Sequence, residues 1–157
     1  MTHKHQKETE CKIKIITVSD TRNIEKDKSG DKIQEILNDK KHTIDRTIIK
    51  DNKTQIINKI SQKYDLIIYC GGTGISKRDV TVEAIKPLLD KEITGFAQYF
   101  RSKSFEEVGS RAILTRAIGG VINNTLVFAL PGSVNAAKTG AKIIKKELNH
   151  LMYHIKQ

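Results

Sequence analysis

The chain has 157 residues, of which 38% are hydrophobic, and this size predicts one domain whose core needs neither disulfides nor a structural metal. Its formal net charge of +10 favours anionic ligands. However, only 5% of the residues are aromatic and no long basic run occurs, so the chain lacks the base-stacking aromatic side chains and the continuous basic surface of a nucleic-acid-binding protein. Net charge is the only feature that favours a nucleic-acid-binding module, so we do not expect nucleic acid as a partner. We do not expect a membrane as a partner either, because no apolar run reaches the roughly 18 residues that a membrane span needs.

The first segment, residues 1–11, is polar and charged and contains no apolar core of a signal peptide. It is predicted to be a disordered tail, so that residues 12–157 form a single folded domain. The two cysteines, Cys11 and Cys70, are not spaced as metal ligands. Lone thiols without a signal peptide indicate a reducing compartment, and we expect a cytoplasmic location.

Strand and helix patterns alternate through the first half of the chain. Apolar runs and alternations predict strands at 12–18, 43–49 and 66–69. Helical spacing of apolar residues predicts two intervening helices, at 30–38 after a Ser29 N-cap and at 54–61. Strands and helices joined by short links form parallel βαβ units with right-handed crossovers. The predicted fold class is therefore α/β, a three-layer doubly wound, mostly parallel sheet flanked by helices.

The next predicted elements are two helices. One begins near Val82, with Thr81 as its N-cap, and is interrupted by Pro87. The other covers 94–104, where the apolar residues return at helical spacing.

A small β-hairpin and a long helix complete the chain. Two apolar segments, 119–121 and 125–129, are separated by Asn123-Asn124, a pair that suits a hairpin turn. The last helix is predicted over 134–155. Ser133 stands where it can cap this helix or bind an anion at its N-terminus.

The stretch from Asp65 to Glu83 carries the most specific pattern. A buried strand runs directly into Gly71-Gly72-Thr73-Gly74, where glycines allow positive φ and consecutive N–H groups can form an anion-binding nest. No Gly-Lys pair follows, which excludes a P-loop. Lys77 stands where a dinucleotide fingerprint needs its third glycine, which argues against a nicotinamide oxidoreductase. A tight turn and a phosphate site both fit, and the charged residues at 77–79 favour the phosphate site.

Polar residues follow each of the first three predicted strands. Ser19 and Asp20 follow the first, Asp51 follows the second, and the glycine turn with Asp79 follows the third. Ligands of doubly wound sheets bind outside the carboxyl ends of the strands, and neighbouring strands are only about 4.8 Å apart. Asp51 and Asp79 could therefore face a common magnesium-bound phosphate. Asp51 also suits an N-cap or Asx-turn before the next helix, and the sequence alone favours that alternative.

Four motifs, in order along the chain, resemble one family. Gly71-Gly72-Thr73-Gly74 with Asp79, Thr81 and Glu83 is similar to the GGTG-x-x-x-x-D-x-T-x-E signature of the molybdenum cofactor biosynthesis proteins of the MogA/MoaB type, which are related to the G domain of gephyrin. The other three motifs resemble the family's first strand and turn, its MoaB branch and its late LPG turn, and they are residues 16–21 (ITVSDT), 104–110 (SFEEVGS) and 130–133 (LPGS). The resemblance covers residues 12–151 and is closest to MoaB.

This resemblance implies a protein that binds molybdopterin and transfers AMP from Mg-ATP to its terminal phosphate, with Mg²⁺ as cofactor and a trimer or hexamer as assembly. It implies Asp51 and Asp79 as the catalytic and metal-binding acids. The positions implied to contact substrate or nucleotide are Ser19, Asp20, Gly71, Gly72, Thr73, Gly74, Thr81, Ser110, Pro131, Gly132 and Ser133. Arg111 and Arg116 are either phosphate contacts or surface charges, and Glu106-Glu107 is expected to be solvated or at a subunit contact.

The chain departs from the family pattern at two places. Relatives often carry a second acid after the aspartate that ends the second strand, whereas Lys50-Asp51-Asn52 keeps one carboxylate. Val134 stands where many relatives carry a proline. The alternative function is therefore a non-catalytic molybdopterin-binding or carrier protein of the same pathway.

Overall fold

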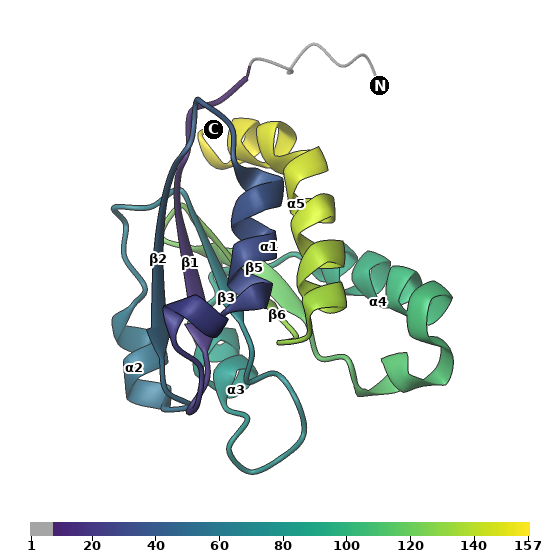
Figure 1. Ribbon diagram of the computed structural model, residues 1–157. Helices are drawn as coiled ribbons and strands as arrows, with labels where there is room; N and C mark the ends of the chain where they lie inside the picture. Colours follow the sequence, from purple (N-terminus) through teal and green to yellow (C-terminus); the bar gives the residue numbers. More distant parts are fainter. Residues whose placement is uncertain (1–7) are drawn as a thin grey trace.

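The computed structural model describes residues 8–157, which form a six-stranded sheet in the order β2-β1-β3-β6-β5-β4 (Figure 1). The parallel strands are β1 (Lys12–Val18), β2 (Thr43–Ile49), β3 (Leu66–Cys70) and β6 (Thr125–Leu130). The antiparallel part consists of β5 (Ile118–Ile122) and the short edge strand β4 (Lys91–Glu92). The prediction of a mostly parallel sheet is confirmed, and β3 ends at Cys70 rather than at Tyr69.

Helices cover both faces of this sheet, which makes the predicted three layers. On one face lie α1 (Lys28–Leu37) and α5 (Val134–Ile155), with α4 (Thr94–Val108) beside α5 (Figure 1). The other face is covered by α2 (Lys53–Asn58) and α3 (Thr81–Ile85). Short 3-10 turns lie at Ile24–Lys26, Lys86–Leu88 and Gly109–Leu114.

The central strand β3 is buried on both sides and divides the core in two. Its alternate side chains Leu66, Ile68 and Cys70 pack under α1, α4 and α5. Ile67 and Tyr69 point into the second core, under α2 and α3. A strand covered on both faces must be apolar throughout, which is why this segment reads as an unbroken hydrophobic run.

The predicted hairpin is confirmed at the turn between β5 and β6. Asn123 has φ of 47° and Asn124 has φ of 65°. Consecutive positive φ angles match the twist of a two-residue hairpin, and asparagine tolerates them better than most residues. The hairpin gives β6 its place beside β3, so that the turn after β6 reaches the same sheet edge as the turn after β3.

Helix boundaries differ from the predicted ones where adjacent polar residues compete for the cap. Asp27, rather than Ser29, caps α1, and its Oδ1 accepts the N–H of Gly30 at 3.1 Å. The two helices on the second face differ less: α2 is shorter than predicted, and α3 passes into a 3-10 turn that contains Pro87. By contrast α4 is longer than predicted: it ends at Val108 and is capped by Gly109, which has φ of 64°.

The predicted disordered tail is described only in part. Residues 1–7 lie outside the described residues, whereas Cys11 is buried and the N–H of Thr9 donates to Asn149 Oδ1 at 3.1 Å. The packed part of the chain therefore begins before Lys12. Across residues 8–157, none of the helices combines the length and the apolar character that a membrane span requires.

Candidate active site

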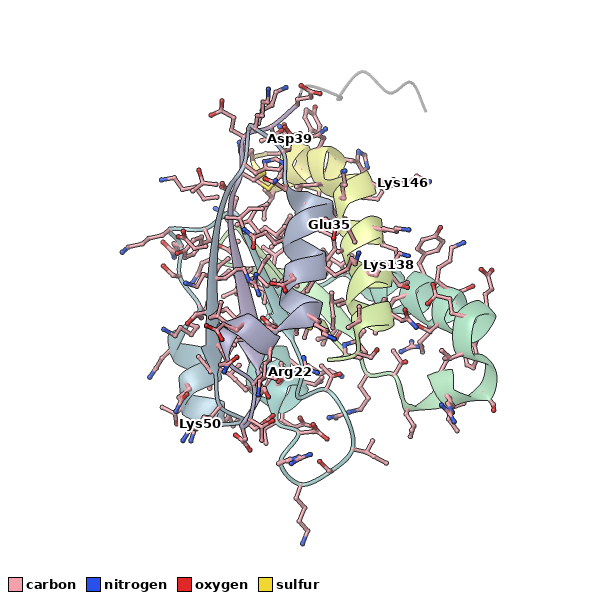
Figure 2. The ribbon with its side chains drawn as sticks, viewed as in Figure 1. Arg22, Glu35, Asp39, Lys50, Lys138 and Lys146 are labelled. Carbon is pink, nitrogen blue, oxygen red and sulfur yellow. The ribbon has the colours of Figure 1, made fainter. Side chains whose placement is uncertain are left out.

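A cavity of about 550 Å³ opens at the carboxyl ends of the parallel strands. Its wall consists of the loops after β1, β2 and β3, the end of α4 with the following 3-10 turn, and the turn between β6 and α5. In Figure 2 this is the lower edge of the sheet, where Arg22 marks the loop after β1 and Lys50 follows β2. The strand-end loops that were predicted to share one edge do so.

Close approaches that only glycine tolerates fix the glycine turn after β3. Gly71 has φ of 108° and Gly72 has φ of 71°. A Cβ on Gly71 would collide with the carbonyl oxygen of Val18, and a Cβ on Gly72 would collide with the hydroxyl of Thr81. The N–H of Gly71 donates to the carbonyl of Leu130 at 2.9 Å. The glycines are therefore required because β1, β3 and β6 end side by side.

Thr81 lies beneath this turn, fully buried, and does not line the cavity. Its hydroxyl donates to the carbonyl of Gly71 at 2.8 Å, and its N–H donates to the carbonyl of Gly72 at 3.0 Å. The prediction that Thr81 caps α3 is wrong, because Val80 is the N-cap and makes no side-chain bond. The hydroxyl instead supports the turn from below.

Arg116 supports the outer half of the same loop. Its Nε donates to the carbonyl of Thr73 at 3.0 Å, and its Nη2 donates to the carbonyl of Gly74 at 2.6 Å. Its Nη1 pairs with Glu83 Oε1 at 2.5 Å, and this hydrogen bond lowers the pKa of the Glu83 carboxyl. Because Arg116 bonds to the protein with all three nitrogens, it acts as a support of the loop rather than as a phosphate contact.

Asp79 stabilises the loop after β3 by hydrogen bonds to a residue of the same loop. Its Oδ2 accepts the N–H of Ser76 at 3.0 Å and the hydroxyl of Ser76 at 2.6 Å. A Cβ on Gly74 would stand 2.6 Å from that same oxygen, so Gly74 leaves room for the carboxylate. Within residues 8–157 no hydrogen-bond donor reaches Oδ1, and Asp79 lines the cavity. One oxygen therefore shapes the loop while the other is available to a ligand.

Asp51 is not the cap of α2, contrary to the alternative that the sequence favoured. Its neighbour Asn52 caps the helix and accepts the N–H of Gln55 at 3.0 Å. The backbone N–H of Asp51 donates to Asp20 Oδ1 at 3.0 Å, and its side chain lines the cavity. The capping role of Asn52 leaves the carboxylate of Asp51 directed to the site.

The carboxylates on this side of the cavity repel one another. Partial burial raises the pKa of Asp51, the negative charges of Asp20 and Asp79 raise it further, and Arg78 opposes the shift. A cation would relieve this repulsion. Within residues 8–157 no group of three or more His, Cys, Asp or Glu side chains could hold a metal ion. Mg²⁺ is usually bound by one or two carboxylates together with substrate phosphates, and Asp51 with Asp79 fits that kind of shared site.

Positive charge also lines the cavity. Arg78 lies beside the carboxylates, Arg22 and Arg111 are further lining residues, and α5 starts at the cavity. Ser133 is the N-cap of α5, as predicted, and its Oγ accepts the N–H of Ala136 at 3.2 Å. The N-terminus of a 22-residue helix carries unpaired N–H groups and a partial positive charge, both of which favour an anion.

The structure brings most of the predicted site residues together. The cavity is lined by Ser19, Asp20, Asp51, Gly71, Gly72, Thr73, Gly74, Asp79, Pro131, Gly132 and Ser133. Of the remaining two, Thr81 is buried beneath the turn, and Ser110 is exposed on the 3-10 turn outside the lining. The chemical role of each residue stays a prediction.

The site prediction omitted several lining residues, among them Arg22, Glu107 and Asn135. Arg22 has no local motif that distinguishes it from a surface charge. Glu107 was expected to be solvated or at a subunit contact; it is exposed, it also lines the cavity, and its carboxylate accepts the hydroxyl of Thr139 at 2.8 and 2.9 Å. Asn135 could have been found from its place in the first turn of α5.

The fold and this cavity define a class of protein: an open α/β domain with a cavity at the carboxyl ends of its parallel strands. A glycine turn, two neighbouring carboxylates and a helix N-terminus line this cavity. Residues 14–150 match the family model described as a probable molybdopterin-binding domain. Molybdenum cofactor biosynthesis protein B of Staphylococcus epidermidis is 45% identical to the chain and aligns with 98% of it and 96% of its own length.

Solved structures agree with this match. A crystal structure of molybdenum cofactor biosynthesis protein B superposes with a TM-score of 0.88 at 43% identity, over 94% of this chain and 97% of that one. The tungsten cofactor synthesizing protein MoaB from Pyrococcus furiosus gives a TM-score of 0.84 at 43% identity, over 94% and 98%. The chain belongs to the molybdenum cofactor biosynthesis family of the MoaB/MogA type, as its motifs predicted.

Proposed function

We propose that this protein binds molybdopterin in the strand-end cavity and, with Mg-ATP, transfers AMP to its terminal phosphate. The observation that carries the proposal is the division of charge within one cavity. Asp20, Asp51 and Asp79 lie near one another, whereas Arg22 and the N-terminus of α5 supply positive potential elsewhere on the wall. A reaction that joins a phosphate monoester to a metal-bound nucleotide needs both kinds of surface.

The chemistry accounts for the residue types. An oxygen of the terminal phosphate attacks the α-phosphorus of ATP, the bond from that phosphorus to the β-bridging oxygen breaks, and pyrophosphate leaves with the electron pair. The attacking phosphate is already an anion, so no protein nucleophile is required. Both reactants are negatively charged, so catalysis consists of positioning and charge neutralisation. When bound, Mg²⁺ supplies neutralisation at the nucleotide phosphates.

Each group of residues has a distinct role in this proposal. Asp51, Asp79 and the nucleotide phosphates would together hold the metal. Asp20 orients Asp51 because its Oδ1 accepts the backbone N–H of Asp51. The N–H groups of Gly72, Thr73 and Gly74 cradle phosphate oxygens. Ser19 and Ser133 line the cavity and supply polar contacts.

The test incubates pure protein with molybdopterin, ATP and Mg²⁺ and follows adenylylated molybdopterin and pyrophosphate by mass spectrometry. Wild type is expected to form both products, and Asp51→Ala and Asp79→Ala to lose at least about 100-fold in rate. Glu25→Ala removes an exposed carboxylate of the 3-10 turn outside the cavity and is the matched control. Full activity of both aspartate variants would remove these acids from the reaction.

A second candidate is a molybdopterin-binding carrier without transferase activity. It is favoured by one observation: where relatives often keep a second acid, this chain has Asn52, whose side chain caps α2 and does not line the cavity. Saturable binding of molybdopterin, with no adenylylated product under the conditions above, supports the carrier and excludes the enzyme.

We also propose that the protein is a homo-oligomer, either a trimer or a hexamer. Five large apolar side chains are about half exposed or more along α4 and the following 3-10 turn, namely Tyr99, Phe105, Val108, Ile113 and Leu114. Apolar surface concentrated in this way is typical of an interface. Light scattering after size exclusion should give three or six times the chain mass of 17.7 kDa, and a monomer would contradict the proposal.

A further inference from the structure

The carbonyl oxygen of Gly132, in the turn before α5, is held by two side chains, one from the loop after β1 and one from the first turn of α1. Nη1 and Nη2 of Arg22 both donate to it at 3.3 Å. The hydroxyl of Ser29 donates to it at 2.7 Å. The donors and the acceptor are more than 100 residues apart in the chain, so the contact joins two separate walls of the cavity.

Arg22 is itself fixed in place. Its Nη1 lies 3.4 Å from Ser29 Oγ and 4.0 Å from Asp27 Oδ1, and only 1% of the Asp27 side chain is exposed. Asp27 is anchored in turn by the hydroxyl of Thr17 at 2.7 Å and by Nη2 of Arg46 at 2.9 Å. The guanidinium therefore bridges a buried carboxylate and the Gly132 carbonyl rather than moving freely in solvent.

This contact decides which way the next N–H group points. A trans peptide is planar, so its C=O and the following N–H point in opposite directions. Since the Gly132 oxygen is held by Arg22, the N–H of Ser133 points away from that side chain. Ser133 lines the cavity, and across residues 8–157 its N–H donates to no protein acceptor.

We propose that Arg22 is a positioning residue that holds the Gly132–Ser133 peptide with its N–H toward the cavity, so that the start of α5 binds a phosphate group. The identity of that group rests on the proposed function, which makes it the terminal phosphate monoester of molybdopterin. Gly132 carries no side chain and resists rotation of this peptide only weakly. Without Arg22 the peptide can turn over and present its carbonyl oxygen, which repels an anion.

A purely electrostatic role for Arg22 makes a different prediction. In that case Arg22→Lys, which keeps the charge but loses the two-pronged hydrogen bond, would bind phosphate as well as wild type. Positioning requires instead that Arg22→Lys and Arg22→Gln are both impaired, and that Ser29→Ala is impaired in the same direction. Lys28→Gln removes a positive charge from the same segment at an exposed side chain and is the matched control.

The experiment is a titration of the ¹⁵N-labelled full chain with inorganic phosphate, followed by the amide resonance of Ser133. In wild type this resonance is expected to move saturably, and in Arg22→Lys and Arg22→Gln the dissociation constant rises about tenfold. Lys28→Gln is expected to stay within about twofold of wild type. An unresponsive Ser133 amide in wild type, or equal affinity in Arg22→Lys, would overturn the inference.

The same variants separate this inference from the proposed function. If wild type forms no adenylylated molybdopterin but the phosphate titration behaves as expected, the positioning role stands and the transferase proposal fails. If wild type is an active transferase, the variants should raise the KM for molybdopterin about tenfold and leave the KM for ATP unchanged. An unchanged KM for molybdopterin in Arg22→Lys would overturn the positioning role while the transferase proposal stands.

Discussion

The carboxylate of Asp51 lies beside Gly72 in the glycine turn. Its Oδ1 is 3.1 Å from the point that a Cβ of Gly72 would occupy, so a side chain at position 72 would crowd the carboxylate. The absent side chain gives Asp51 access to the same space as the N–H groups of the turn. The glycine thus serves both the backbone conformation and the placement of the acid.

Gly72→Ala should destabilise the protein and abolish ligand binding. Its φ of 71° is strained for alanine, and the new Cβ collides with the Thr81 hydroxyl. We expect the free energy of unfolding, from urea denaturation, to fall by about 2 kcal/mol. Gly95→Ala is the control, because a Cβ there meets nothing within 4 Å and alanine favours α4, which should leave stability equal or raise it by about 0.5 kcal/mol. Wild-type stability of Gly72→Ala would contradict the argument.

Asp51→Asn should stabilise the protein while removing its function. Burial and the neighbouring carboxylates raise the folded-state pKa of Asp51 above its ordinary 3.8, so the ionised group destabilises the fold at neutral pH. We expect the thermal midpoint at pH 7 to rise by about 2 °C, and the gain to vanish as pH falls below about 3.8, where both states are protonated. In the presence of ATP, Mg²⁺ should stabilise wild type more than the variant. A lower midpoint at pH 7 would show that the carboxylate is stabilising instead.

Arg116→Ala should loosen the glycine loop more than it weakens the whole fold. Arg116 is partly exposed and joins Thr73, Gly74 and Glu83, so we expect a global loss of about 1 kcal/mol and faster amide hydrogen exchange at residues 73–79. The pKa of Glu83 is lowered by this contact, so its stabilisation is present above the ordinary value of 4.5 and is lost as pH falls through the folded-state value. Arg111→Ala removes an exposed guanidinium and should leave exchange in the loop unchanged. If amide hydrogen exchange at residues 73–79 were the same in Arg116→Ala and Arg111→Ala, Arg116 would not support the loop.

Asp27→Asn should be among the most destabilising polar substitutions in the protein. Asp27 is 1% exposed, accepts from Thr17, and pairs with Arg46, which is itself largely buried. Loss of the carboxylate leaves the buried positive charge of Arg46 without its buried partner. We expect the free energy of unfolding, from urea denaturation, to fall by about 3 kcal/mol. Asp31→Asn removes the other partner of Arg46, but Asp31 is 57% exposed and should cost about 0.5 kcal/mol or less. Similar losses for the two variants would contradict this ranking.

Neither cysteine should react in the native state. Burial raises the pKa of Cys70 to about 12 and that of Cys11 to about 11, and both thiols are nearly inaccessible. Iodoacetamide at pH 8 is therefore expected to leave native protein unmodified and to add two groups in denaturant, as read by intact mass. Rapid modification of Cys70 in native protein would instead assign it a reactive role beside the glycine turn.

The sequence by itself determined the order of the strands and helices along the chain, apart from the short edge strand β4, and the edge at which the site lies. Apolar alternation, helical spacing and the Asn123-Asn124 turn are local patterns, and they correspond to β1, β2, β3, the hairpin and α5. Because parallel strands end at the same edge, the positions of Asp20, Asp51 and Asp79 after three strands were enough to bring them together.

The tertiary structure alone decided what each polar side chain does. Asp27 or Ser29 could cap α1, and Asp51 or Asn52 could cap α2, because neighbouring Asp, Asn and Ser have similar capping energies. Packing settled the choice, since Ser29 reaches Gly132 and Asp51 faces the cavity. The contact of Arg22 with Gly132 spans 110 positions, a separation that no local pattern encodes. Such contacts exist only after the sheet has brought its loops to one edge.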